Sequence, residues 1–137
     1  MLASPAILSS ALVTILAIAL YYYMGFRVGQ MRSKHGVKAP AVTGAAEFER
    51  ALRVQLNTLE HLTAFIVLLW LATIYFAWFP LLAPLLGVVW IIGRAMYMDA
   101  YMKDPAKRGP GFGVSSAAEI LLLLLALTGV LIAWTTV

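Results

Sequence analysis

Residues 50–61, with the sequence RALRVQLNTLEH, lead directly into an apolar run from Leu62 to Phe79. The length of this run falls within the roughly 17–25 residues that a transmembrane helix needs, so it predicts a membrane span. The residues in front of it are unusually polar for a segment that continues into a membrane helix. The other predicted features of the chain are considered in relation to this polar segment and the membrane span that follows it.

An α-helix turns by about 100° per residue, which sets the direction of each side chain in residues 50–61. Five polar side chains fall within one arc of roughly 100°, namely Arg50, Arg53, Asn57, Glu60 and His61. Gln55 points elsewhere, about 200° from Arg53. Charged side chains at membrane depth are costly and face a bundle interior or a wet cavity. The pattern therefore predicts a binding site for a polar, charged ligand.

The composition places this chain among integral membrane proteins. Of its 137 residues 63% are hydrophobic and only 12% are charged, whereas soluble domains are about half apolar and a quarter charged. The length allows one membrane domain, residues 1–137. The sequence contains no cysteine, so any thiol chemistry needs a thiol supplied by a substrate.

Four apolar segments predict an all-α, four-helix membrane bundle. The expected helices cover approximately residues 6–26, 46–78, 81–102 and 114–134. Between them, residues 27–45 and 103–113 are expected to be non-helical because both contain glycine and proline. Four spans place these two loops on the same side of the membrane.

Basic residues gather on that side. Nine of the ten lie in the two loops or in the helix ends beside them, and Arg94 is the tenth. The positive-inside rule predicts that this side is cytoplasmic and that both termini lie opposite. The net charge of +4 is therefore a topology signal, and we expect no nucleic-acid partner.

The third helix carries a second polar stripe at the same depth. Arg94, Tyr97 and Tyr101 lie within about 60° of one another on the helical wheel. Taken singly, each residue has a simpler explanation. Arg53 and Glu60 could be an ion pair that fixes packing, the tyrosines could be interface anchors, and His61 could be a packing residue. Two stripes at one depth favour a shared site.

The chemistry of these side chains suits a small zwitterionic peptide. Arginines pair with carboxylates through two parallel hydrogen bonds, Glu60 can hold an ammonium, and Asn57 and the tyrosines can bond amides. A metal site is not expected, because His35 and His61 are the only histidines and lack ligand spacing. A transporter is not expected either, since the helices are unbroken and unrepeated.

Two motifs carry a resemblance to a known family. They are ERxxRxQxNxxEH at residues 49–61 and GRxxYxxxY at residues 93–101. The chain resembles the membrane-associated proteins in eicosanoid and glutathione metabolism over essentially its whole length, and is most similar to the microsomal glutathione transferase branch. The resemblance implies a homotrimer with glutathione bound between subunits in the cytosolic half.

The resemblance also implies roles for individual residues. It makes Arg108 the residue that stabilises the glutathione thiolate, and Gln55 a contact to glutathione from the adjacent subunit. The other expected glutathione contacts are Arg32, Arg53, Asn57, Glu60, His61, Arg94, Tyr97 and Tyr101. Glutathione would be a co-substrate, and no metal is implied.

Two departures bear on the activity. Leukotriene synthases of the family have tyrosine at the position of His61 and arginine at that of Ser33, which disfavours leukotriene synthesis. The expected function is a detoxifying glutathione transferase that acts on lipophilic electrophiles, or on hydroperoxides as a peroxidase. The alternative is a non-catalytic membrane scaffold that binds lipid or protein.

Overall fold

A computed structural model describes residues 4–136, and within that range it contains helices but no strand. The long helices are α1 (Pro5–His35), α2 (Ala46–Tyr75), α3 (Leu82–Lys103) and α4 (Gly109–Thr135), and a short 3₁₀ helix, η1 (Pro105–Arg108), precedes α4. All four long helices are long and apolar enough to cross a membrane. The predicted four-helix membrane bundle is confirmed.

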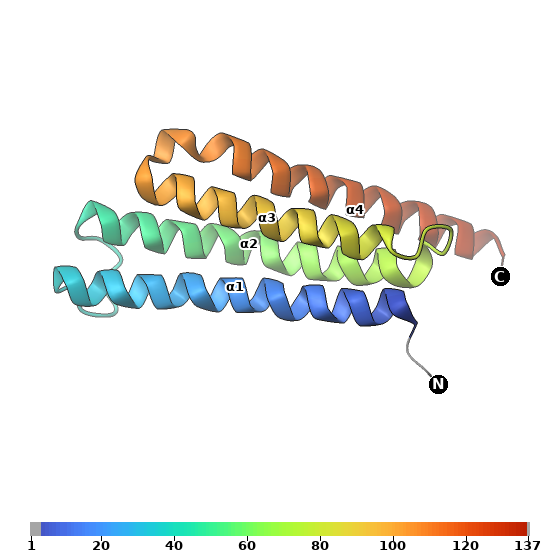
Figure 1. The fold of residues 1–137 in the computed structure, drawn as a ribbon, viewed down its shortest axis with the longest axis horizontal. Coiled ribbons are helices and arrows are strands. Elements are labelled where there is room, and N and C mark those ends of the chain that lie inside the picture. Colours follow the sequence, from blue (N-terminus) through green and yellow to red (C-terminus); the bar gives the residue numbers. More distant parts are fainter. Residues whose placement is uncertain (1–3, 137) are drawn as a thin grey trace.

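The helices run up and down, so that both polar connections meet at one end. Figure 1 shows the loop of residues 36–45 and η1 at this end, with the connection of residues 76–81 and both described chain ends at the other. We call the first of these the loop end. It contains the polar stripes of α2 and α3.

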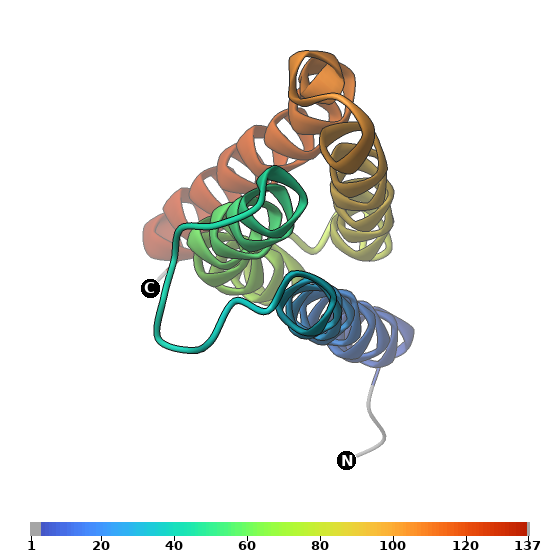
Figure 2. The ribbon, with the colours of Figure 1, turned by 90° about the vertical axis from the view of Figure 1, so that its left-hand side faces the viewer.

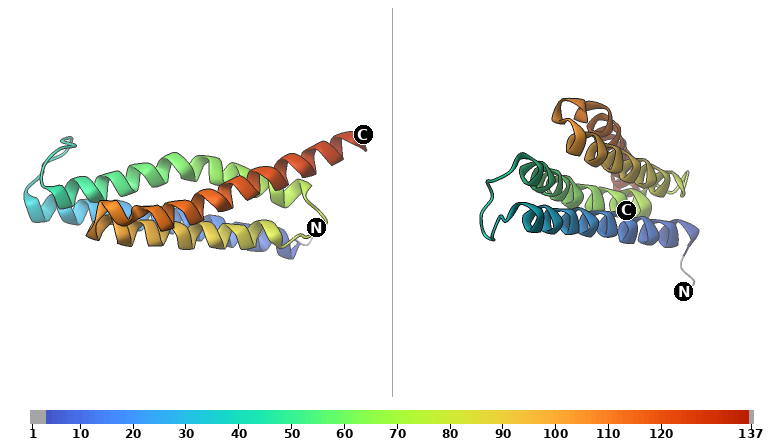
Figure 3. Two further views of the ribbon diagram at one scale, coloured as in Figure 1. Left: turned by 90° about the horizontal axis from the view of Figure 1, so that it is seen from above. Right: turned by 60° about the vertical axis from the view of Figure 1, so that its left-hand side comes forward.

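Helices α2 and α3 each pack against all of the other long helices. Viewed from the loop end, α2 lies nearest the middle of the bundle, with α1, α3 and α4 around it, and α3 lies beside α1 (Figure 2). In Figure 3, α4 runs past the connection between α2 and α3. One face of α2 is therefore directed toward α1 and another toward α3 and α4.

The apolar half of the bundle is held by aromatic stacking and by polar contacts between helices. The rings of Phe65 and Trp90 stack with centroids 4.0 Å apart. The Ser10 and Thr73 hydroxyls lie 2.7 Å apart. Hydrocarbon offers polar groups no water, so such groups find partners on neighbouring helices.

Glycines bring α3 and α4 close together at the loop end. A Cβ atom on Gly93 would lie 2.6 Å from the backbone nitrogen of Ser115. One on Gly111 would lie 2.3 Å from the backbone nitrogen of Tyr97. Only glycine fits such an approach. This contact sets the position of the start of α4 against the polar stripe of α3.

The first helix is longer than predicted. It was expected to end at about Phe26, but α1 continues to His35 and ends at Gly36, which has a left-handed φ of 65°. The polar residues in this extension are mostly good helix formers. Val28 in the extension is buried with Phe48 of α2, so packing stabilises the added turns.

The prediction that residues 103–113 form a non-helical link was also wrong. It folds as η1 and the first turn of α4, which begins at Gly109 instead of about Val114. Pro105 and Pro110 occupy first-turn positions, where proline's fixed φ suits a helix and its missing N–H is not needed. In addition, α2 ends at Tyr75 rather than about residue 78, and α3 covers 82–103 rather than 81–102.

Candidate functional site

A cavity of about 410 Å³ opens at the loop end between α2, α3 and the start of α4. Its lining consists of Arg53, Asn57, Tyr97, Tyr101, Arg108 and Phe112. All of these except Phe112 are candidate residues from the sequence. A second cavity of about 390 Å³ shares Arg53 and Tyr101 with the first and adds Arg50. The structure therefore brings two polar stripes and the second basic loop together around a cationic site.

Helix α2 contributes a row of side chains with helical spacing. Arg53, Asn57 and Glu60 share one face because they are separated by four and then three residues. The Arg53 Nη1 and Glu60 Oε1 atoms are 3.8 Å apart, and the side chains are 54% and 58% exposed. The Asn57 amide donates to Glu60 Oε2 at 3.4 Å. A long, exposed ion pair is weak, so both charges are available to a ligand.

Arg94 lies behind the cavity and is fully buried. Its Nη2 donates to Asn57 Oδ1 at 2.6 Å and to Thr58 Oγ1 at 3.0 Å, and its Nη1 donates to Ser115 Oγ at 3.4 Å. The guanidinium carbon also lies 4.5 Å from the centroid of the Tyr97 ring. These contacts hold two lining residues, Asn57 and Tyr97, from behind.

Aromatic residues of α3 and α4 form another wall. The rings of Tyr97 and Tyr101 have centroids 5.5 Å apart, and the Phe112 ring lies 6.2 Å from that of Tyr97. Arg108, at the end of η1, is exposed, and its guanidinium carbon lies 6.0 Å from the Tyr101 centroid. Its Nη1 donates to the Pro105 carbonyl at 3.2 Å. The guanidinium is therefore accessible beside the aromatic wall.

His61 lies next to the cavity but does not line it. Its Nδ1 is 2.8 Å from Glu119 Oε2, and its ring contacts Phe112 edge to face at 5.5 Å. The same Glu119 oxygen accepts from Trp90 Nε1 at 3.3 Å. The sequence analysis did not select Glu119, although a carboxylate inside an apolar span is itself a signal of function.

Arg32 and Gln55 are not brought to the cavity. The Arg32 Nη1 donates to the Ala41 carbonyl at 2.8 Å, and the guanidinium stacks over Phe48 at 4.6 Å. The Gln55 side chain faces α1, where its Nε2 lies 2.9 Å from the position of a Cβ atom built on Gly25. Both residues therefore lie on the α1 side of α2, whereas the cavity lies on the α3 side.

Three further site residues were missed by the sequence analysis: Thr58, Ser115 and Phe112. Thr58 lies about 140° from Arg53 on the helical wheel, outside the polar arc. Ser115 and Phe112 reach the site because α4 starts early and packs closely on α3. Among the described residues 4–136, no group of three or more His, Asp or Glu side chains gathers to hold a metal.

Comparison with known proteins gives a consistent result. Residues 10–128 match the MAPEG family. An uncharacterized Synechocystis sp. protein, sll1147, is 45% identical over 121 residues, which cover 88% of this chain and 87% of that protein. Microsomal glutathione S-transferase 2 of Mus musculus is 42% identical over 120 residues, covering 88% and 80%. Leukotriene C4 synthase of Cavia porcellus is 36% identical over 121 residues, covering 88% and 79%.

The family match spans most of the chain and includes the four apolar helices and the cavity residues. The relatives are matched over most of their own length, so the similarity concerns the whole fold and not one motif. With four membrane-spanning helices in the bundle, this chain is a multi-pass integral membrane protein and belongs to the MAPEG family.

Proposed function

We propose that this protein is a membrane glutathione transferase, which activates the thiol of glutathione for attack on lipophilic electrophiles. The observation that carries the proposal is the cavity in which Arg53, Arg108 and Asn57 meet two tyrosines. Its cationic and amide-bonding groups suit a small peptide with two carboxylates, an ammonium and a thiol. The name of one relative, a microsomal glutathione S-transferase, supports the same substrate.

The γ-glutamyl end of glutathione fits the open pair of Arg53 and Glu60. Their charged atoms are 3.8 Å apart, so each can exchange this weak contact for a closer one with the ligand. The α-carboxylate binds Arg53, and the α-ammonium binds Glu60. Asn57, already oriented by Arg94, bonds a peptide group. The other carboxylate is held by Arg50 of the adjoining cavity.

Arg108 is the residue that activates the thiol. A free thiol has a pKa of about 8.5, so little of it is thiolate at neutral pH. A neighbouring cation favours the thiolate and lowers the pKa of the thiol. The proton leaves to water, and the sulfur lone pair forms a carbon–sulfur bond with the electrophile, which either releases its leaving group as an anion or takes the electron pair of its double bond onto the neighbouring atom. Arg108 is exposed and lies against the aromatic wall, within reach of a substrate from the lipid phase.

A homotrimer would complete the site. Arg32 and Gln55 lie on the α1 side of α2, so the chain that holds the cavity does not supply them to it. A neighbouring copy that presents its α1 side would bring both residues over the ligand.

Because the sequence lacks cysteine, a pair of introduced cysteines at Gln55 and Phe112 gives a clean test. A disulfide between copies is expected, and its absence would contradict the arrangement.

The proposed orientation places the loop end in the cytoplasm, where glutathione is abundant as a soluble substrate. The excess of basic residues at this end supports it. The lipophilic co-substrate arrives from the bilayer. The same thiolate can attack the O–O bond of a lipid hydroperoxide to give the lipid alcohol and glutathione sulfenic acid, which a second glutathione converts to the disulfide and water. Peroxidase activity is therefore assayed beside conjugation. A non-catalytic scaffold of the same fold would show neither activity and no response to glutathione.

The experiment is to measure thiolate formation by ultraviolet difference absorbance when glutathione is added to purified protein at neutral pH. Wild type is expected to give the thiolate signal, and Arg108→Ala is expected to lose it together with most of its turnover at saturating glutathione. Lys107→Ala, which removes a neighbouring exposed cation from η1, should retain both. Equal turnover in Arg108→Ala and wild type would refute the assigned role.

Glu60→Gln tests the binding mode separately. It removes the charge that holds the ammonium and keeps the side chain's size. Calorimetry is expected to show weaker glutathione binding by about tenfold, which corresponds to the loss of one charge-assisted hydrogen bond. Unchanged affinity would reject Glu60 as the ammonium partner while leaving thiol activation untouched.

A further inference from the structure

Another cavity, of about 130 Å³, lies at the loop end between α1, α2 and α3. It shares no lining residue with the two cavities of the candidate site. Tyr23 and Arg27 of α1 contribute polar groups to it, and Met24, Met98 and Met102 contribute flexible apolar ones. Nothing in the proposed glutathione chemistry uses these residues.

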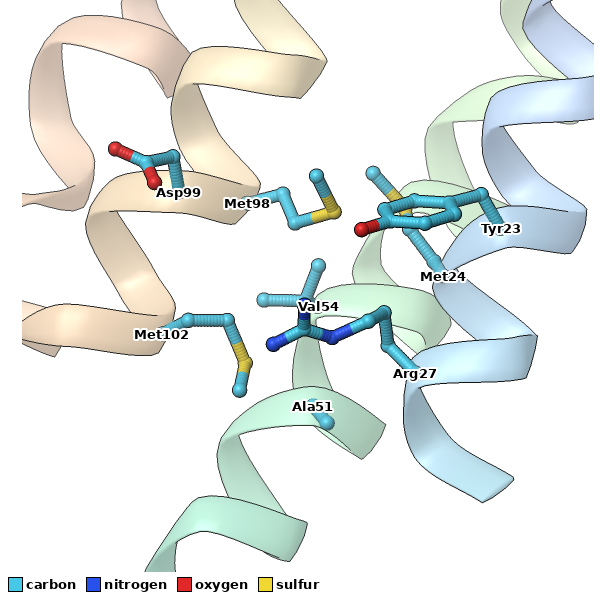
Figure 4. A pocket seen from close by; sticks show the side chains of 8 residues that line it. All are labelled: Tyr23, Met24, Arg27, Ala51, Val54, Met98, Asp99 and Met102. Atoms are coloured by element: carbon cyan, nitrogen blue, oxygen red, sulfur yellow. The ribbon is translucent and has the colours of Figure 1, made fainter. Parts of the chain in front are cut away.

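Arg27 has an unused hydrogen-bond donor in this cavity. Its Nε atom is buried and has no partner among the described residues 4–136. Figure 4 shows its guanidinium reaching from α1 toward α3, with the Tyr23 hydroxyl also turned toward the cavity. A buried N–H donor without an acceptor is unfavourable. A ligand that brings an acceptor would remove this cost.

The lining of the cavity contains one cationic side chain, that of Arg27. Asp99 is the acidic residue in its lining, but its Oδ2 already accepts from Lys103 at 2.7 Å. In Figure 4 the carboxylate of Asp99 is turned away from Arg27. Asp99 is therefore paired with Lys103 and not with Arg27. The complementary group is an anion.

A separate apolar groove lies farther from the loop end, also between α1 and α3, and shares no lining residue with this cavity. Its walls include Leu12, Leu16 and Val88, and its volume is about 290 Å³. Leu16 lies eleven residues before Arg27, which is three helical turns, so both are on one face and about 16 Å apart along α1. The seam between α1 and α3 thus offers a cavity with a cationic side chain and, about 16 Å farther along α1, an apolar groove.

The cationic end lies at headgroup depth. Arg27 directly follows the apolar run of residues 6–26, which closes with three tyrosines and a phenylalanine near its end. Tyrosine is typical of the membrane–water interface. Basic pockets between transmembrane helices at this depth bind anionic headgroups.

We propose that the seam between α1 and α3 is a binding site for an anionic phospholipid. The phosphate accepts from the Arg27 guanidinium and the Tyr23 hydroxyl, and one acyl chain lies in the groove lined by Leu12, Leu16 and Val88. The site is separate from the glutathione cavity and does not depend on the proposed activity.

The experiment measures stabilisation of the detergent-solubilised protein by short-chain lipids. Dioctanoyl phosphatidylglycerol is titrated against dioctanoyl phosphatidylcholine, and thermal unfolding is followed by tryptophan fluorescence. Wild type is expected to respond to phosphatidylglycerol at a concentration at least about tenfold lower, since a charge-assisted hydrogen bond contributes about that factor. Inorganic phosphate at equal concentration is expected to give no stabilisation, because it lacks the acyl chains.

Variants assign the preference to Arg27. Arg27→Gln should lose most of the difference between the two lipids, and Arg27→Lys should retain part of it because the charge remains but the planar fork does not. Lys38→Gln, which removes an exposed loop cation, should respond like wild type. Glutathione-dependent turnover should be unchanged in Arg27→Gln, which separates this site from the proposed activity.

Three results would overturn the proposal. The first is a wild type without preference for phosphatidylglycerol, which decides the matter even if Arg27→Gln does not fold. The second is a full preference retained in Arg27→Gln. The third is a change in oligomeric state of that variant without any change in lipid response, which would make the seam a contact between copies of the chain.

Discussion

The contact between α3 and α4 is tested most directly by replacing Gly111 with alanine. The added Cβ would lie 2.3 Å from the Tyr97 nitrogen and 2.8 Å from the Met96 carbonyl carbon. Both atoms belong to the backbone of α3, so no side chain can rotate to make room. The start of α4 must therefore move away from α3.

The size of the effect follows from two opposing contributions. Overpacking of this kind costs about 1–3 kcal/mol, whereas glycine to alanine inside a helix contributes about 1 kcal/mol of stability. Gly113→Ala is the matched control, since a Cβ there meets nothing within 4 Å. Both glycines lie in the first turns of α4, so the difference between the two variants, about 1–3 kcal/mol, isolates the steric contribution.

The assay is reversible unfolding in mixed micelles of mild detergent and dodecyl sulfate, followed by circular dichroism. Gly111→Ala is expected to be less stable than wild type, and Gly113→Ala equally or more stable. Because Phe112 would move away from Tyr97, glutathione binding should also weaken in Gly111→Ala only. Equal free energies of unfolding for the two variants would refute the reasoning that this close approach holds the site together.

Two further substitutions test the groups behind the cavity. Arg94→Met should lower the free energy of unfolding by about 1–3 kcal/mol, because Asn57 Oδ1 loses its buried donor. The same variant should raise the KM for glutathione, because Asn57 is no longer held in place. An unchanged KM would show that Asn57 binds glutathione without support from Arg94. Glu119→Leu should cost a similar amount, about 1–3 kcal/mol, because Trp90 Nε1 loses its acceptor. Glu119→Gln keeps an acceptor and should unfold close to wild type, so equal losses in both variants would contradict the role given to that hydrogen bond.

Several features of this protein can be predicted from its sequence because they depend on local periodicity. Apolar runs of sufficient length specify membrane helices whatever their neighbours are. The spacing of Arg53, Asn57 and Glu60 places them on one face of α2, since the helix itself sets their directions. The same reasoning selected Tyr97 and Tyr101, and all of these except Glu60 line the cavity.

Local patterns were less reliable at helix ends, where packing decides. Glycine and proline in residues 103–113 indicated a loop, but the prolines stand at helix starts and Gly111 serves close packing. Likewise, the polar residues after Phe26 continue α1, because its added turns are buried against α2.

The sequence by itself determined the class of this protein, the order of its helices and which polar side chains share a face, because hydrophobic length and helical geometry are properties of each segment alone. Only the tertiary structure decided that Arg94 lies behind the cavity, that one oxygen of Glu119 contacts both Trp90 and His61, and that Arg27 lines a separate cavity. These relations join residues distant along the chain, and they depend on how closely the helices approach one another.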